Sequence, residues 1–386
     1  MPALFTVIIS FLGALACALM PADSHRRIRW VALLTAGLGL ATAFCCALRY
    51  SGPGIADEIN SAWISSLGVS FITGYDGISL PLLLVTGLVG VSGVLFTWNL
   101  DHRANQFYAF YFTLIGGVYG VFLSLDLFLL FVFYEIAIVP KYFLIAIWGG
   151  TKREYAAMKL TLFLMAGSAL LFPALASVYW VGGVDSWSIP DLMAVEFSAQ
   201  YQFFVYPFLY LGFGVLAGMF PFHTWLPDAH VEAPTAVSVI LAGVLLKMGT
   251  YGILRFNYPM LPETTTEQWV STMIAVFGVI NIVYGALVAM VQPDMKKLVA
   301  YSSVSHMGIV VLGLNLAVLG QAGADALNGA VFQMFAHGVM TALAFALIGF
   351  FYDQTHTREL DDLGGLMQQI PFVGTLFMMT AMASLG

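Results

Sequence analysis

Apolar segments of membrane-spanning length recur along the whole chain and alternate with short polar connections. A transmembrane helix needs about 20 predominantly apolar residues. Segments of this kind lie near residues 3–20, 30–49, 78–98, 107–123, 127–148, 157–180, 203–221, 236–256, 269–291, 302–319 and 326–350, and a twelfth begins at Phe372. The pattern predicts an all-α polytopic membrane protein with about 12 transmembrane helices.

The ends of the chain and its connections bear on domain organisation. The first apolar segment has no basic residues before it and no small-residue cleavage site after it, so we expect a retained helix, not a cleaved signal peptide. The last segment stops at Gly386, short of spanning length, so we expect the sequence to end within its twelfth helix. The longest connections, near 50–77 and 181–202, are too short for a folded domain, which predicts one membrane domain over 1–386.

The composition agrees with a lipid environment, because 60% of the 386 residues are hydrophobic and only 9% are charged. Soluble domains carry about 25% charged residues, so soluble enzymes and secreted disulfide scaffolds are excluded. The net charge of −7 argues against nucleic acid as a partner. Cys17, Cys45 and Cys46 form no metal-binding motif, and the chain has no dinucleotide fingerprint or P-loop. We therefore expect no metal and no cofactor here, and any redox chemistry on another chain.

Lysine and arginine are distributed unequally between the connections. Those after odd-numbered segments hold ten, namely Arg26, Arg27, Arg29, Arg103, Lys152, Arg153, Lys159, Lys296, Lys297 and Arg358. Those after even-numbered segments hold only Arg49 and Arg255. Because positively charged loops stay on the cytoplasmic side, the odd connections are predicted to face the cytoplasm or its equivalent, and the N-terminus is predicted to lie outside.

Most charged residues lie at or near the ends of the predicted spans, and three lie farther inside, where each costs about 2.5–3.5 kcal/mol on insertion scales. Glu135, near the middle of the fifth span, is either a proton-carrying carboxylate or a neutral, hydrogen-bonded structural acid. Lys141 follows Pro140 in the same span and either faces the interior or extends its amine to the membrane surface. Lys247 is too far from both ends of the eighth span to reach the surface, which favours a functional role.

Histidines and a broken helix accompany these charges. His306 begins the tenth span and His337 lies in the middle of the eleventh; imidazole exchanges protons near neutral pH, but it can also simply join two helices by a hydrogen bond. Between the seventh and eighth spans, the sequence PFHTWLPDAHVEAPT carries three prolines, which predicts a helix break of the kind that lines ion pathways. His223 lies in this break, whereas Asp228 and His230 are expected to serve in capping and in the loop. The whole set is typical of a proton relay through a helix bundle.

The same regions resemble a known family. The segments MFPFHTWLPDAHVEAPTAVSVILAGVLLKMGTYGILRF (219–256), YEIAIVPKYFLIAIWGG (134–150), DMKKLVAYSSVSHMGIVVLG (294–313) and FQMFAHGVMTALAFALIGFFYDQTHTREL (332–360) are similar to those of the antiporter-like, proton-pumping membrane subunits of respiratory complex I, the NADH:quinone oxidoreductase. The resemblance implies fourteen helices, an outside N-terminus and two inverted five-helix repeats, each with a broken helix. Here it implies N-terminal helices over 1–106, a first repeat over 107–256 and a second over 269–386 that ends within helix twelve.

The proton relay of this family maps onto individual residues of the chain. The resemblance matches Glu135 to its fifth-helix glutamate, Lys247 to its eighth-helix lysine, and His306 and His337 to the histidines of its tenth and eleventh helices. With His223 in the broken helix and Lys141, these residues form the expected relay. The family's twelfth-helix glutamate would lie after the end of the sequence.

One position departs from the family pattern. The family's seventh helix carries a lysine, but Leu216 occupies that position in FGVLAGMFP (213–221). Lys141 stands where the family commonly has methionine or valine. We hypothesise that Lys141 replaces the missing lysine as the electrostatic partner of Glu135, with its amine within about 8 Å of the carboxylate or of a water chain that reaches Lys247.

The resemblance implies a proton-translocating subunit that is driven by redox chemistry in other subunits and holds no redox site itself. Its expected partners are the other membrane-arm subunits, the transported protons and the lipid bilayer of an energy-transducing membrane, such as a bacterial inner membrane. Three alternatives stay open. They are a subunit of an Mrp-type cation/proton antiporter, a membrane subunit of an ion-pumping hydrogenase, and a non-transporting structural membrane subunit.

Overall fold

The apolar segments form helices in the computed structural model, which describes residues 2–320 and 323–385. The first six long helices are α1 (Pro2–Leu19), α2 (His25–Arg49), α3 (Ser79–Phe96), α4 (Ala104–Leu123), α5 (Leu127–Trp148) and α6 (Arg153–Gly182). The later ones are α8 (Ala199–Leu216), α14 (Gln268–Met290), α15 (Met295–Val318) and α16 (Gly323–Thr355). Between α8 and α14 lies a continuous helical segment made of α10 (Thr235–Ile240), η2 (Leu241–Leu245), α11 (Leu246–Gly252), η3 (Ile253–Asn257) and α12 (Tyr258–Met260). Short helices complete the chain: α7 (Ile189–Met193), α9 (Trp225–Glu232), α13 (Pro262–Thr266), η4 (Leu360–Asp362), α17 (Leu366–Gln369) and α18 (Pro371–Leu385).

Ten helices in the described part of the chain are long and apolar enough to cross a membrane, which confirms the prediction of a polytopic helical protein. The predicted count of about 12 is not confirmed. The seventh predicted span corresponds to α8, which is not among the ten and which ends before a break at 217–224 that leads into α9. The break contains Gly218, with φ 70°, and Pro221, both of which are unfavourable in a continuing helix. The twelfth corresponds to α18, of only 15 residues.

One connection forms a hairpin, which the purely helical prediction did not include. Strands β1 (Ala56–Ile64) and β2 (Val69–Tyr75) pair antiparallel, and the chain between them forms η1 (Ser65–Leu67) followed by Gly68 with φ 68°. The β2 sequence VSFITGY is rich in β-branched and aromatic residues, which favour strands. The backbone N–H of Ser70 donates to the carboxylate of Asp126 at 3.1 Å and fixes the hairpin to the start of α5.

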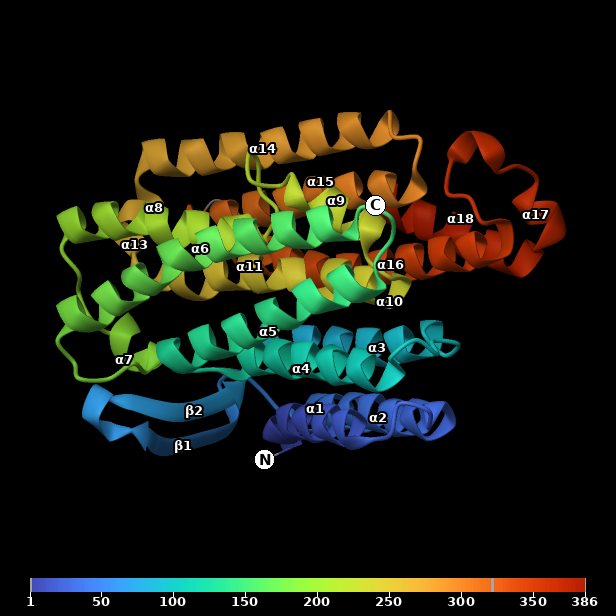
Figure 1. Cartoon of the computed structure of the whole chain (residues 1–386). Helices are drawn as coiled ribbons and strands as arrows, with labels where there is room; N and C mark the ends of the chain where they lie inside the picture. The colour runs from blue at the N-terminus through green and yellow to red at the C-terminus, as the bar shows by residue number, and fades with distance from the viewer. Residues whose placement is uncertain (1, 321–322, 386) are drawn as a thin grey trace.

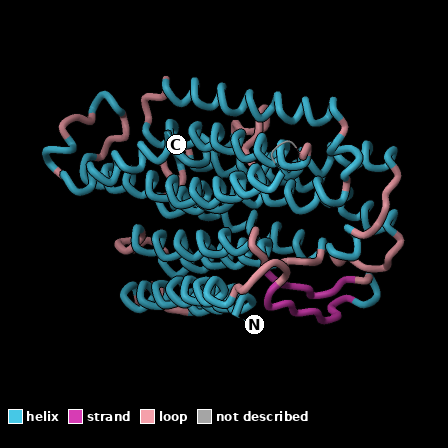
Figure 2. Tube along the Cα trace, turned by 180° about the vertical axis from the view of Figure 1, so that it is seen from behind, coloured by secondary structure: helices cyan, strands magenta, loops and turns pink. Residues whose placement is uncertain are grey.

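The helices lie side by side in layers (Figure 1). The α1–α2 pair and the hairpin form one edge, α3, α4 and α5 follow, and α14 forms the opposite edge beside α15. From behind, the hairpin again lies next to the N-terminal helices (Figure 2). The hairpin and α7 lie at one end of the bundle and α17 at the other, as expected for connections that alternate between the two membrane surfaces (Figure 1). The segment from Thr235 to Met260 is the most buried of the ten candidate spans, so it occupies the centre.

Candidate functional site

Lys247 lies in α11 at the centre of the bundle, and its side chain is wholly buried. It follows the π-helical segment η2, in which each backbone hydrogen bond spans one residue more than in an α-helix. The Nζ atom donates to the carbonyl of Ala242 within η2 and lies 2.6 Å from Nδ1 of His337. Such π-helical turns are frequent at functional sites, and this one leaves a carbonyl within reach of the ammonium group.

Two histidines extend the polar site from Lys247. His337, on α16, is wholly buried, and the centre of its ring lies 5.1 Å from that of His306 on α15. The side-chain amide of Gln333, one turn before His337, lies 3.0 Å from Nδ1 of His306. Nε2 of His337 is buried and has no hydrogen-bond partner in residues 2–320 and 323–385. Lys247, His337 and His306, all predicted from the sequence, therefore form one contiguous cluster.

Glu135 and Lys141, both on α5, do not form a direct ion pair. Glu135 lines a groove of about 370 Å³ between α4 and α5, together with Phe110 and Thr113 of α4. Lys141 is wholly buried, so its amine does not extend to the membrane surface, which was one of the two expectations for this residue. The two side chains interact electrostatically. Neither the Lys141 Nζ nor the Glu135 Oε1 has a hydrogen-bond partner among the described residues.

The break after α8 contains His223, which lies apart from the Lys247 cluster. Its buried ring packs against the rings of Phe220, Tyr284 and Tyr301, and neither ring nitrogen has a partner within the part of the chain that is described. The positive charge of Lys159, on α6, interacts electrostatically with His223. Leu216, at the end of α8 beside the break, is wholly buried, as expected for an apolar side chain in place of a lysine.

Lys159 is a charged residue whose position the sequence did not reveal. The prediction counts it with a cytoplasmic connection, but the structure places it within α6, more than one turn after Arg153. Its Nζ lies 2.6 Å from the carboxylate of Asp228 in α9. Asp228 was expected to serve in capping, and its side chain instead joins two helices. The only signal in the sequence was a lysine inside the predicted span 157–180.

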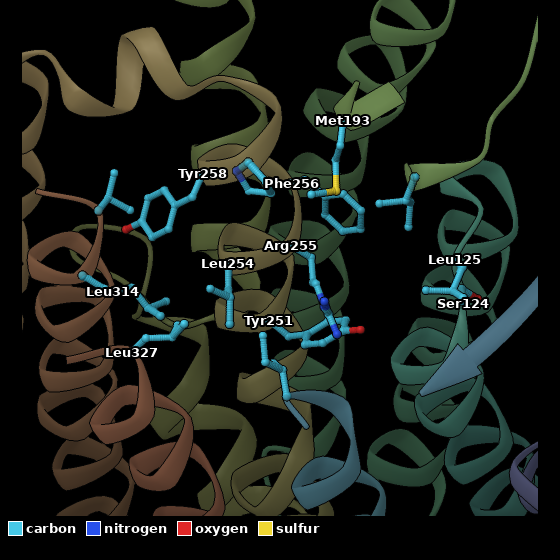
Figure 3. Close-up of a pocket in the computed structure, with 15 residues that line it drawn as sticks. Ser124, Leu125, Met193, Tyr251, Leu254, Arg255, Phe256, Tyr258, Leu314 and Leu327 are labelled. Atoms are coloured by element: carbon cyan, nitrogen blue, oxygen red, sulfur yellow. The ribbon is translucent and has the colours of Figure 1, made fainter. Parts of the chain in front are cut away.

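A second polar group lies toward the end of the bundle that carries the hairpin. Tyr251 and Arg255, which follow Lys247 at successive intervals of four residues, line a mainly apolar cavity of about 390 Å³ (Figure 3). The Arg255 guanidinium lies 5.3 Å from the centre of the Tyr251 ring and forms an ion pair with Asp76, at the end of the hairpin. The Tyr251 hydroxyl donates to the Phe122 carbonyl at 3.3 Å. This group ties the central helix to α4 and to the hairpin.

The chemistry that this arrangement permits is proton exchange. Lys247 and His337 are within the distance at which a proton passes between heavy atoms. When Lys247 is the donor, Nδ1 of His337 is the acceptor, and the proton of the neutral ring is on Nε2. His306, whose ring centre lies 5.1 Å from that of His337, can then continue the path.

Comparisons with known proteins agree with the resemblance in sequence. Residues 124–386 match the model of the family described as "NADH:quinone oxidoreductase/Mrp antiporter, TM". The "NAD(P)H-quinone oxidoreductase chain 4-2" of Synechocystis sp. is 40% identical over 100% of this chain and 68% of the relative. The "NAD(P)H-quinone oxidoreductase chain 4 2" of Microcystis aeruginosa is 39% identical over 98% of this chain and 68% of the relative.

Solved structures share the fold over nearly the entire chain. A chain of respiratory complex I from Thermus thermophilus superposes with a TM-score of 0.90 at 27% identity, covering 100% of this chain and 78% of that chain. A chain of the Mrp complex from Dietzia sp. superposes with a TM-score of 0.88 at 23% identity, covering 100% of this chain and 70% of that chain, which shows a common fold. The protein is thus a multi-pass membrane protein that belongs to the NADH:quinone oxidoreductase/Mrp antiporter family.

Proposed function

We propose that this chain is a proton-translocating membrane subunit of an NADH:quinone oxidoreductase and that redox chemistry in other subunits drives it. The observation that supports this most strongly is the buried cluster of Lys247, His337 and His306, which comes from three helices and is contiguous at the centre of the bundle. Ionisable groups at this depth are costly, and proton relays are one of the few uses that retain them.

In the proposed mechanism, Glu135 receives the driving signal. Because it lines a groove between α4 and α5, a change of charge in an adjacent subunit can act on it directly. The charge on Glu135 then alters the proton affinity of the buried Lys141, and the change reaches Lys247 through the interior. Lys247 passes its proton to His337 and His306, while His223 and Lys159 form a separate polar group at the helix break.

The partners in this proposal are the other membrane-arm subunits, the lipid bilayer and the transported protons. The membrane is an energy-transducing one, such as a bacterial inner membrane, with the N-terminus outside. The connections after odd-numbered segments hold ten Lys and Arg residues and those after even-numbered segments hold two, and this difference supports the proposed orientation. A cysteine placed in the hairpin should react with an impermeant maleimide added to intact cells, and a cysteine placed near Arg26 should not.

A chain of an Mrp complex shares the fold of this chain, so the fold does not distinguish the antiporter alternative from the proposed function. The two are distinguished by which ion is transported. A cation/proton antiporter subunit requires sodium or another cation for proton movement, whereas the proposed subunit does not. The structural alternative leaves the buried Lys247–His337 contact unexplained, because a non-transporting core is more stable with apolar side chains at these positions.

The experiment is proton transport by the whole complex reconstituted in liposomes, with Glu135→Gln or Lys247→Ala in this chain. We expect both variant complexes to assemble. The part of the proton transport that passes through this subunit should be at least about tenfold slower than in the unaltered complex, so the vesicle interior should acidify more slowly. Sodium-free buffer should leave transport by the unaltered complex unchanged. Normal proton transport by both variants would refute the relay, and a requirement for sodium would favour the antiporter.

A further inference from the structure

The surface at the start of α2 carries two arginine side chains that lack a partner in the described part of the chain. Arg26 and Arg27, in the first turn of α2, are exposed, and neither guanidinium group forms an ion pair or a hydrogen bond with a described residue. With Asn99 and Asp101 of the α3–α4 connection, they line an open hollow of about 850 Å³. Free guanidinium groups at a hollow favour an anionic ligand that accepts several hydrogen bonds.

Asp101 joins the two walls of this hollow. Its carboxylate lies 2.6 Å from the Arg29 guanidinium and 3.9 Å from Nδ1 of His25, so the connection after α3 is held against the start of α2. These contacts also use the negative charge of Asp101. Three arginines and two aspartates line the hollow, and because Arg29 neutralises Asp101, the exposed Arg26 and Arg27 leave an excess of positive charge.

A pair of tryptophans places the hollow at the membrane surface. Trp30 is exposed, and its ring meets that of Trp98 edge-on with 5.4 Å between centres. Trp30 follows His25 by five residues, which is about 7.5 Å along the helix axis. The headgroup layer on each side of a bilayer is about 5–8 Å thick, because the whole bilayer measures about 40–45 Å and its hydrocarbon core about 30 Å. The tryptophans therefore lie where the headgroups meet the hydrocarbon, and the arginines lie among the headgroups.

An exposed apolar stripe continues from Trp30 toward the centre of the membrane. Trp30 lies three residues after Arg27 in α2. Leu34 and Leu38 follow at further intervals of four residues, so all four side chains share one face of the helix, and both leucines are exposed. A cation, an interfacial indole and then leucines match the order of phosphate, ester and acyl chain in a phospholipid. A soluble anion would match only the first of these.

We propose that this face of α2 binds one anionic phospholipid molecule from the leaflet that surrounds the start of the helix. The guanidinium groups of Arg26 and Arg27 donate to the phosphate oxygens. The indole N–H of Trp30, which has no partner among the described residues, donates to an ester oxygen, and one acyl chain lies along Leu34 and Leu38. This binding does not require that the chain moves protons, so it goes beyond the proposed function and does not rest on it.

The alternative explanation for Arg26 and Arg27 is orientation alone. Positive charges in a connection hold that connection on the cytoplasmic side during insertion, and they do so without binding a particular lipid. Under that explanation, ordinary lipid or another subunit covers this face of α2. The two explanations differ in whether one anionic phospholipid stays bound after the surrounding lipid is exchanged.

The test counts the phosphatidylglycerol molecules that stay bound to the whole complex after it is washed with detergent that contains phosphatidylcholine. Arg26→Gln/Arg27→Gln removes both charges of the site. Lys152→Gln/Lys297→Gln is the matched control, because it removes two charges from other connections predicted to face the same side. We expect the arginine variant to retain one phosphatidylglycerol fewer than the unaltered complex and the control to retain the same number. In titrations with phosphatidylglycerol, the arginine variant should need roughly 30-fold more lipid to regain that molecule.

Unchanged retention in the arginine variant, or an equal loss in the control, would overturn the inference. Displacement of the retained lipid by inorganic phosphate alone would also overturn it, because the site would then bind a free anion. If the arginine variant does not assemble, as judged by the rate of quinone reduction, Trp30→Leu replaces it. This substitution keeps both charges and should still lose the lipid, and full retention by Trp30→Leu would contradict the proposed site. Proton transport is measured separately, so a failure of the proposed function is not confused with a failure of lipid binding.

Discussion

The Nζ atom of Lys247 lies 2.6 Å from Nδ1 of His337, although the two residues are 90 positions apart in the sequence. Both side chains are wholly buried. The contact joins α11 to α16 at the centre of the bundle, and it converts two isolated ionisable residues into one site. The first prediction concerns this pair.

Lys247→Met and His337→Leu should each impair proton transport, and the double variant should be no slower than the slower single variant. Two residues that act in sequence on one path are not additive, whereas independent residues multiply their effects. The measurement is the initial rate of proton uptake in a double-mutant cycle. A double variant slower by the product of the two single effects would show that the residues lie on separate paths.

Gly249→Ala should destabilise the protein and slow transport. A Cβ at this position would lie 2.5 Å from the Phe213 carbonyl oxygen and 2.5 Å from the Ala217 backbone nitrogen, so α11 must shift away from α8. The shift also moves Lys247, two residues earlier. We expect a loss of about 1–3 kcal/mol in the free energy of unfolding.

Gly329→Ala is the matched control for that substitution, because this glycine is also helical and no described atom outside its own stretch of helix lies within 4 Å of the added Cβ. Alanine at position 329 should leave the free energy of unfolding equal to that of the unaltered protein or slightly higher. Thermal unfolding in detergent measures both variants. Equal stability of the two variants would contradict the close approach of α11 and α8.

Asp76→Asn should lower stability at neutral pH but not in acid. Burial acts to raise the pKa of Asp76, but Arg255 and the backbone N–H groups of Ser79 and Ile78 outweigh it and hold that pKa below its ordinary value of 3.8. A carboxyl whose pKa is lower in the folded state stabilises that state above the unfolded pKa, and the effect is lost as the pH falls through the folded pKa. Asparagine still accepts the two backbone hydrogen bonds, so the substitution removes mainly the charge.

At pH 7, Asp76→Asn is expected to lower the free energy of unfolding by about 1 kcal/mol. This destabilisation should shrink as the pH falls below 3.8, and it should vanish once the pH is below the lower pKa that Asp76 has in the folded state. Melting temperatures at several pH values measure it, with the exposed Asp361→Asn as control. A deficit that stays constant into acid would mean that the charge of Asp76 does not stabilise the fold.

Lys141→Met should slow proton transport if Lys141 replaces the lysine that is missing at Leu216. Adding Leu216→Lys to this variant should then restore part of the rate, because it returns a positive charge to the helix break. The rates of the single and double variants measure this in the same liposomes. Normal transport by Lys141→Met would show that the amine of Lys141 has no part in the relay.

The sequence revealed the helices and the isolated polar residues well, because lipid forces apolar side chains into continuous runs and makes each exception visible. It did not reveal the hairpin, because the strands at 56–75 lie in a polar connection without a strong alternating pattern. It also missed the contact of Lys159 with Asp228, since that ion pair depends on how α9 packs against α6.

His230 illustrates the same limit. In the sequence it is one polar residue among prolines and acids, which favours a capping role. Its burial and its stack on Phe345 follow from the packing of α9 against α16. Local patterns do not determine which of two histidines in a broken helix faces the centre.

The most direct test of the relay is the number of protons moved per electron by the reconstituted complex with Lys247→Ala, relative to the complex with His356→Gln. Both complexes should reduce quinone, so that the ratio reports coupling and not assembly. We predict that Lys247→Ala lowers the ratio and that His356→Gln leaves it unchanged. An unchanged ratio in an assembled Lys247→Ala complex would contradict a proton relay through Lys247 and His337.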